Sequence, residues 1–107
     1  MKALTVRQPW AWALVHGRQT SEWRSWPTRH RGNLLIHAGL GTDQDGSKLY
    51  PEAFDSMIHG AIIGAVHVVD CLKLGERDYE WVLENPEAFD APQPCKGRLG
   101  IWNYTPS

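Results

Sequence analysis

The alternation of apolar and polar positions predicts a chain of short strands separated by glycine and proline, with two short helices. Runs rich in β-branched and aromatic residues predict strands over Lys2–Val6, Thr20–Trp26, Asn33–Ala38, Ala61–Leu72, Tyr79–Glu84 and Arg98–Tyr104. One helix is expected over residues 9–16, since Pro9 suits a first helical turn and Gly17 suits a stop. A second is expected over Leu49–His59. Residues 39–47 read as a polar loop, and Asn85–Pro94 reads as a proline-rich connector.

These elements predict an α+β fold, a small mixed β-barrel of about six strands with two short helices, because sequential strands joined by short links pack in this way. A chain of 107 residues has room for one core, so we expect a single domain over residues 1–107. Trp81 and Trp102 alternate with polar neighbours on their strands and are expected in the core.

Composition excludes several classes of protein. The apolar content of 42% is enough for a packed core, and no apolar run is long enough to cross a bilayer. The first residues are charged too early for a signal peptide, so we expect a cytoplasmic protein. Cys71 and Cys95 form no CxxC pair, and no HxH or HExxH spacing occurs. We therefore expect reduced thiols, no metal site and no cofactor.

The net charge of −1 conceals a strong asymmetry along the chain. Residues 1–42 hold six Lys or Arg against one acid, whereas residues 43–94 hold three against eleven acids. The tail adds Lys96 and Arg98. This distribution predicts a basic patch built from the N-terminal third and the tail, although scattered surface charges would give the same count.

Four of the six tryptophans lie in the first 26 residues, interleaved with arginines. Indole offers a flat apolar face and guanidinium a flat cation with five donors, a combination that suits a nucleotide. Strand alternation over residues 20–26 places Glu22, Arg24 and Trp26 on one side and Trp23 on the other, which is expected to face the core. Glu22 and Arg24 would contact a base edge and a phosphate, or would form a structural ion pair.

The remaining candidates each have two interpretations. Trp10 and Trp26 either stack on bases or fill the core. The basic turn at Arg29 and Arg31 is a phosphate clamp or a solvated loop, and His37 is a proton carrier or a packed barrel residue. Lys96 and Arg98 either add positive charge at the same binding site or protect the edge of the last strand from pairing with another chain. The candidate ligand-binding residues are Gln8, Trp10, Gln19, Glu22, Arg24, Ser25, Trp26, Arg29, Arg31, His37, Lys96 and Arg98, with Glu22 as the candidate catalytic group.

Several segments together resemble the ASCH domain family, in order and over nearly the whole chain: residues 2–11, 17–24, 25–28, 31–38, 60–64 and 96–102. The resemblance is to the short stand-alone form of bacterial or phage-borne members. It implies a PUA-like fold, a small β-barrel with a helix over one mouth, and an RNA-binding cleft between that helix and the following strand. It also implies that some relatives are enzymes, namely N4-acetylcytidine deacylases and a ribonuclease.

The family pattern at the cleft, Gly-x-Lys-x-x-Glu-x-Arg, is matched here by Gly17, Glu22 and Arg24 but not by Gln19, which replaces the lysine. The deacylase branch uses that lysine and a threonine at the position of Glu22, and this chain has neither. A glutamine side chain is neither a base nor an ammonium, so the substitution weakens the deacylase interpretation.

Three functions are therefore open from the sequence. The first is a module that binds RNA or a nucleotide in a cleft between the N-terminal helix and the following strand. The second is a small hydrolase acting on RNA or a modified nucleoside, with Glu22 as general base and Arg24 stabilising negative charge. The third is a protein-interaction domain whose acidic half faces a basic partner.

Overall fold

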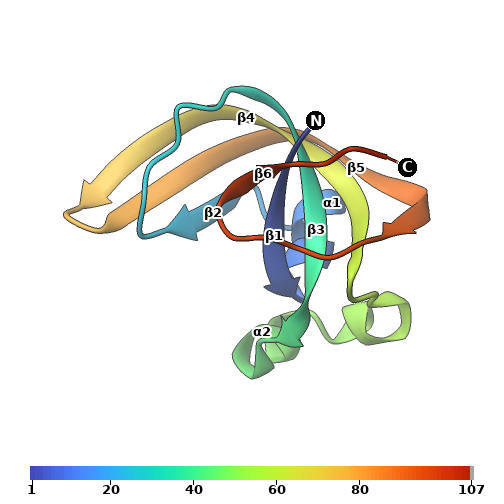
Figure 1. Ribbon diagram of the computed structural model, residues 1–107. Helices are drawn as coiled ribbons and strands as arrows, with labels where there is room; N and C mark the ends of the chain where they lie inside the picture. The colour runs from blue at the N-terminus through green and yellow to red at the C-terminus, as the bar shows by residue number, and fades with distance from the viewer. Residues whose placement is uncertain (107) are drawn as a thin grey trace.

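The computed structural model describes residues 1–106, which form one mixed sheet with a short helix packed on it (Figure 1). The strands lie in the order β2-β5-β4-β3-β1-β6, where β1 pairs parallel to β3 and every other pair is antiparallel. The elements are β1 (Lys2–Gln8), α1 (Trp10–Val15), β2 (Ser21–Arg24), β3 (Gly32–Thr42), α2 (Gln44–Leu49), the 3-10 helix η1 (Pro51–Ser56), β4 (Ala61–Gly75), β5 (Asp78–Pro94) and β6 (Ile101–Asn103).

The predicted α+β class is confirmed, but the predicted closed barrel is not. Closure would require the two edge strands, β2 and β6, to pair with each other, and no such pairing occurs within residues 1–106. Register shifts at four points along the β4–β5 ladder bend these long strands, as bulges do. The sheet therefore curves without joining its ends.

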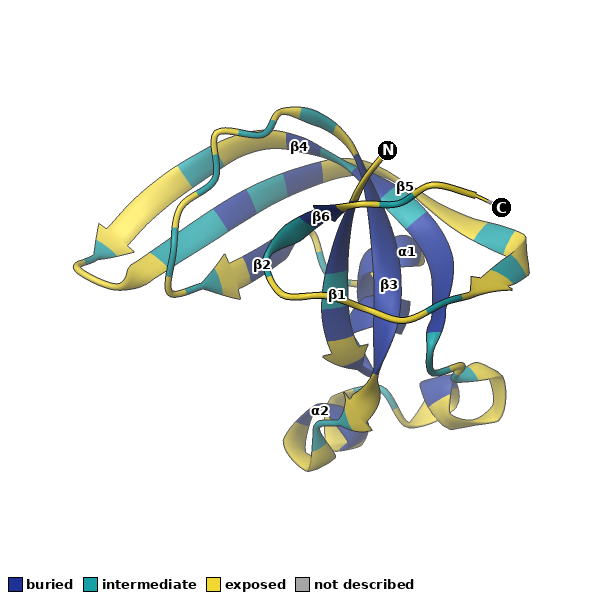
Figure 2. Ribbon diagram, viewed as in Figure 1, coloured by how far each residue is buried: buried dark blue, intermediate teal, exposed yellow. Residues whose placement is uncertain are grey.

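The core lies between α1 and the concave centre of the sheet, where Figure 2 shows continuous burial. Leu14 and Val15 of α1 pack among residues of β1, β3 and β4. Gly64 permits this approach, because a Cβ there would lie 2.7 Å from Val15 Cγ1 and would overlap the carbonyl oxygen of Glu87. Trp81 and Trp102 are buried, as predicted from their strand alternation.

Two predicted segments need correction. The proline-rich connector at 85–94 is the second half of β5, which pairs with β4 from Ala61 to Ala65. Since β2 pairs only with residues 79–82, the other edge of this half is open, and an open edge tolerates prolines that cannot donate to a ladder. The open edge also carries acids, which discourage further pairing.

The second predicted helix lies elsewhere. The helix begins at Gln44, inside the predicted loop, because the Asp43 carboxylate accepts hydrogen bonds from the amides of Asp45 and Gly46. It ends at Leu49, since the residue before Pro51 is sterically driven out of the helical conformation. Within the region predicted as helix at 49–59, only Leu49, the last residue of α2, and the six-residue η1 are helical.

Past the centre of the sheet, β4 and β5 continue as a projecting hairpin, here named the arm and defined as residues 70–82, whose Trp81 still packs in the core. Figure 1 shows it reaching away from α1, with β2 running alongside. Figure 2 shows that its far end is largely exposed. The arm carries β2 and so forms one side of the site described next.

Candidate functional site

A cavity of about 520 Å³ opens between β1 and β2, beside the first turn of α1. It lies where the curved sheet brings its β2 edge near β1 without backbone pairing between the two. The volume is typical of small-ligand sites. The lining residues are Thr5, Val6, Arg7, Trp10, Gln19, Glu22, Trp23, Arg24, Ser25 and Trp26.

An ion pair crosses the cavity wall. Arg24 Nε and Nη2 both approach Glu22 Oε2, at 2.9 and 2.8 Å. Arg24 Nη2 also donates to the carbonyl oxygen of Thr5 at 3.0 Å, a contact that ties β2 to β1 across the gap. These donors fix the guanidinium, while its Nη1 makes no hydrogen bond within residues 1–106. Arg24 can therefore still donate to an anionic ligand.

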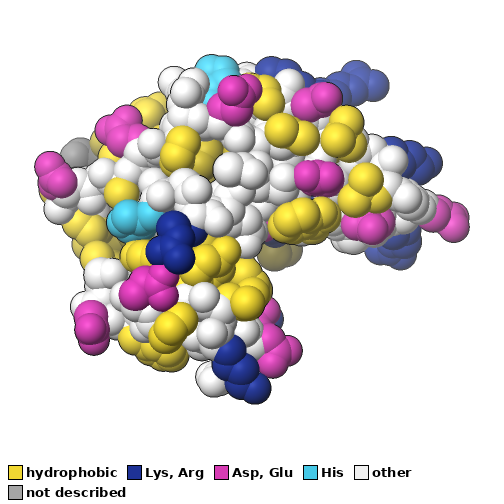
Figure 3. Space-filling model, turned by 180° about the vertical axis from the view of Figure 1, so that it is seen from behind, with side chains coloured by type: hydrophobic (Ala, Val, Ile, Leu, Met, Phe, Trp, Pro, Cys, Tyr) yellow, Lys and Arg dark blue, Asp and Glu magenta, His cyan; other side chains and the backbone are white. Residues whose placement is uncertain are grey.

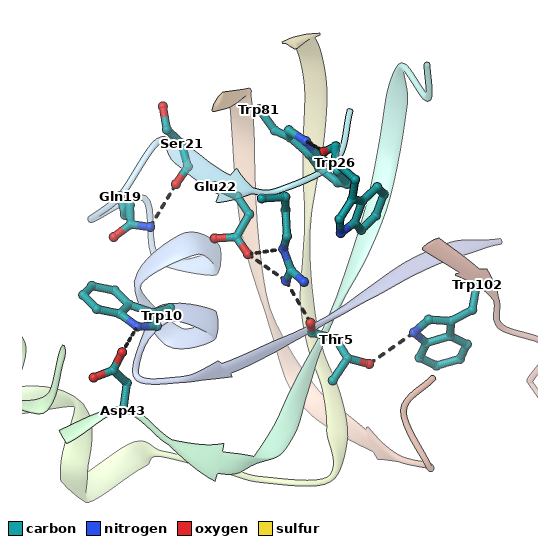
Figure 4. A network of polar contacts seen from close by, with 10 residues as sticks. Thr5, Trp10, Gln19, Ser21, Glu22, Trp26, Asp43, Trp81 and Trp102 are labelled. Atoms are coloured by element: carbon teal, nitrogen blue, oxygen red, sulfur yellow. Dashed lines mark hydrogen bonds and ion pairs between the residues drawn. The ribbon is translucent and has the colours of Figure 1, made fainter. Parts of the chain in front are cut away.

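Glu22 is 8% exposed, and burial raises the pKa of its carboxyl. The charge and the hydrogen bonds of Arg24 oppose this rise in pKa without cancelling it. In Figure 4 one oxygen of Glu22 meets the guanidinium, and the other points toward the side where Gln19 and Trp10 lie. The carboxyl can thus hold a structural pair with one oxygen and accept from a ligand with the other.

Gln19 and Trp10 form the opposite wall of the cavity. Gln19 Nε2 donates to the carbonyl oxygen of Ser21 at 2.9 Å, which fixes the orientation of the amide. Trp10 Nε1 donates to Asp43 Oδ2 at 3.0 Å, and this bond is the largest cause that lowers the pKa of the Asp43 carboxyl. Gly46 packs on the same indole, where a Cβ would lie 2.7 Å from Cζ2. The flat face of Trp10 is therefore held in place before any ligand binds.

Two further indoles differ in their surroundings. Trp26 is half-buried and meets Trp81 edge to face, with ring centroids 4.9 Å apart. Trp23 was expected in the core, but it is 51% exposed. It borders the cavity, yet its pairing with Glu80 places its side chain on the sheet face opposite Glu22 and Arg24. The alternation was predicted correctly, and the expected covering layer over this face is missing from residues 1–106.

Six of the twelve predicted residues line this cavity: Trp10, Gln19, Glu22, Arg24, Ser25 and Trp26. Gln8 does not, because its side chain is buried between the amide of Trp12 and the carbonyl oxygen of Ile58. His37 is also buried elsewhere, with Nε2 at 2.8 Å from the carbonyl oxygen of Cys95. These two side chains hold the chain together around the sheet.

The other four predicted residues are exposed cations outside the cavity. Arg31 donates to the carbonyl oxygens of Thr28 and His30, within its own turn. Arg29, Lys96 and Arg98 are exposed and do not line the cavity. The basic turn and the tail were predicted to lie at the same site as β2. In the structure neither lines this cavity.

Sequence reasoning missed the contribution of β1, namely Thr5, Val6 and Arg7. The Thr5 carbonyl oxygen meets Arg24, whereas its hydroxyl accepts from Trp102 Nε1 on the other side of the strand (Figure 4). Arg7 belongs to the basic and aromatic stretch that opens the chain. The positive charge of Arg7 could have indicated a ligand-binding residue. No pattern in the sequence indicates that β1 and β2 lie next to each other in the fold.

No helix within residues 1–106 has the length and apolarity needed to span a bilayer. Within the same residues, no cluster of three or more His, Cys, Asp or Glu is arranged to hold a metal ion.

Comparison with known proteins gives a consistent family assignment. The chain matches the ASCH domain over residues 4–103. Activating signal cointegrator 1 of Homo sapiens is 30% identical over 127 aligned residues, which cover 92% of this chain and 21% of that protein. The protein of the same name from Mus musculus is also 30% identical, over 128 residues with the same coverage. The chain therefore spans about a fifth of the length of these relatives. The chain belongs to the ASCH domain family.

Proposed function

We propose that this protein binds RNA by taking one nucleotide into the cavity between β1 and β2. The observation that carries the proposal is that a carboxylate, a guanidinium and two oriented indoles, Glu22, Arg24, Trp10 and Trp26, line one cavity of about 520 Å³. The position also agrees with the cleft that the family resemblance implies, between the first helix and the strand after it.

Each wall has a distinct part in this proposal. The base stacks on an indole, an interaction that tolerates any base because every base has a π-face. The second oxygen of Glu22 and the fixed amide of Gln19 meet the polar edge of the base. Arg24 Nη1 and the exposed Arg7 attract the phosphate, so the affinity should fall as salt rises.

The test is fluorescence anisotropy with a short labelled single-stranded RNA at two salt concentrations. Arg24→Ala should weaken binding by at least about tenfold, since it removes a charged phosphate contact and frees the β2 edge from β1. Arg77→Ala, at the exposed turn of the arm, is the matched control and should leave the affinity unchanged. Arg24→Lys keeps the charge but loses the fork to Glu22, so it should fall between the two.

Folding of each variant is checked by circular dichroism. If folded Arg24→Ala and Arg24→Lys bind RNA as tightly as the unmodified chain, the cavity is not the RNA site. If the unmodified chain binds no RNA at low salt, the proposed function itself is wrong.

A hydrolase is a second candidate, favoured by the environment of Glu22. Burial raises the pKa of this cavity-lining carboxyl, and one of its oxygens points toward the side where Gln19 and Trp10 lie. Against it, Gln19 supplies no acid or base, and the chain lacks the lysine and threonine expected for a deacylase. Incubation with single-stranded RNA and with acylated cytidines tests this candidate. Turnover that Glu22→Gln abolishes while binding survives would support it, and equal turnover by both proteins would exclude it.

A further inference from the structure

The strands that carry the cavity have a second, outward face. Across three adjacent strands, Trp23 lies opposite Glu80, and Glu80 lies opposite Leu72. In the next row Ser21 lies opposite Val82, which lies opposite Asp70. Glu84 follows on the same side of β5, because Trp81 and Leu83 between them turn inward to the core. We name as the outer face the residues Trp23, Asp70, Leu72, Glu80, Val82 and Glu84.

Large apolar side chains are exposed on this face. Half of the Trp23 surface is open to solvent, and Leu72, two strands away on the far side of Glu80, is 42% exposed. Leu74 is also exposed, further along β4. Figure 3 shows apolar and acidic side chains interspersed over the rear of the arm, with lysine and arginine along its rim. An exposed aromatic side chain of this kind is typical of protein interfaces.

The charge on the outer face is negative. It carries the carboxylates of Asp70, Glu80 and Glu84, of which Glu80 accepts a hydrogen bond from the Ser21 hydroxyl at 2.6 Å. One cation reaches this face: Arg31 Nη2 lies 3.8 Å from Asp70 Oδ1. His67 pairs with Glu84 across the ladder, and Lys73 lies on the opposite face, beside Tyr79.

We infer that the outer face binds a protein segment that combines Lys or Arg with apolar side chains. The exposed indole and Leu72 supply apolar anchors of the kind enriched in interfaces, and the three carboxylates select a basic partner. RNA is disfavoured here because phosphates would meet carboxylates. A second copy packed through the same face is disfavoured as well, because it would bring like charges together.

Alternation sends the side chains of this surface to the side of β2 opposite Glu22 and Arg24, and among them only Trp23 also borders the cavity. The inference therefore does not rest on RNA binding.

The experiment uses the full chain, isotopically labelled for NMR, and three synthetic peptides. The first peptide alternates lysine with leucine, the second replaces each lysine with glutamate, and the third replaces each leucine with serine. The lysine–leucine peptide should shift the amide resonances of the outer face and the indole resonance of Trp23. The other two peptides should bind at least about tenfold more weakly, since each lacks one half of the complementarity.

Two variants test the site. Asp70→Lys combined with Glu84→Lys should weaken binding of the lysine–leucine peptide by at least about tenfold. Leu72→Ser should weaken it without changing the charge. Glu76→Lys, at the exposed turn of the arm, is the matched control and should change the affinity less than about twofold.

Several results would overturn the inference. They are no binding of the lysine–leucine peptide, equal binding of the glutamate–leucine peptide, resonance shifts confined to the cavity, and an affinity that the outer-face variants leave unchanged. Sedimentation of the free chain adds one more. If the chain dimerises and Leu72→Ser makes it monomeric, the occupant of this face is a second copy and not a basic segment.

Discussion

The two faces of β2 and the arm carry different chemistry on the same three strands. On the inner face, Glu22 and Arg24 form a partly buried ion pair beside the cavity, and Trp81 packs beneath Trp26. On the outer face, Trp23 is half exposed and begins a row that continues with Glu80 on β5 and Leu72 on β4. Adjacent residues in one four-residue strand therefore face a pocket and a flat surface.

The difference shows that the environment of a side chain depends on whether another element packs over its face of the sheet. The inner face is enclosed by β1 and α1, so its polar groups are desolvated and oriented by one another. Within residues 1–106 no element covers the outer face, so Asp70 and Glu84 stay exposed to water, as do Trp23 and Leu72. The first environment suits a small ligand with a polar edge, and the second suits a broad partner.

The largest expected effect on stability comes from disturbing the packing of α1 against the sheet. Gly64→Ala should destabilise the protein by about 3 kcal/mol, because the new methyl group would overlap the Glu87 carbonyl oxygen and press on Val15 of α1. Chemical denaturation measures the loss. Gly75→Ala, near the turn of the arm, is the matched control, since the nearest atom to its Cβ would be Asp78 Cβ at 3.6 Å. Equal losses for the two variants would contradict this account of how α1 packs.

A smaller effect distinguishes the two indoles directly. Trp26→Leu should cost about 1–2 kcal/mol of stability, since Trp26 packs edge to face on Trp81 and contacts the core. Trp23→Leu should stay within about 0.5 kcal/mol because its ring is half exposed. Thermal denaturation of both variants checks this order. If RNA binding is also measured, the loss should follow Trp26, and a loss confined to Trp23 would place the ligand on the wrong face.

The smallest expected effect is on the wall made by Trp10. The hydrogen bond from the indole keeps the pKa of Asp43 below its usual value, so the carboxylate stabilises the folded state above the unfolded pKa. That contribution should disappear as the pH falls through the lowered pKa of the folded state. The Trp10 Nε1–H resonance should therefore shift at a pH below about 4, the ordinary range of aspartate. Asp43→Asn should remove the transition, and an unchanged titration in that variant would show that another group is responsible.

Local chemistry made most of the strands and α1 predictable. Alternation placed Glu22, Arg24 and Trp23 on their correct sides of β2, and it identified Trp81 and Trp102 as core residues. The errors fell where local signals compete. The glycines around residues 39–47 predicted a loop, although Asp43 caps a helix there. The prolines of residues 85–94 predicted a connector, although this segment is the second half of β5, whose open edge tolerates proline.

The candidate site could be predicted in its β2 half and not in its β1 half. Within residues 19–26, strand alternation alone places Glu22 and Arg24 on one side, so this part of the lining follows from the local sequence. Thr5 joins them through a backbone carbonyl, which carries no sequence signal at all. Gln8 and His37 were predicted as site residues from their residue type. In the structure both side chains are buried and hydrogen-bonded to backbone groups away from the cavity.

The sequence by itself determined the alternating strands, the indoles and arginines near the start, and the family to which these motifs point. These follow from side-chain period and residue type, which are local properties. Only the tertiary structure decided that the sheet curves until β2 approaches β1 without pairing, leaving a cavity at the gap and an uncovered acidic face behind it. Bulges and long-range packing set that curvature, and neither is encoded at a single position.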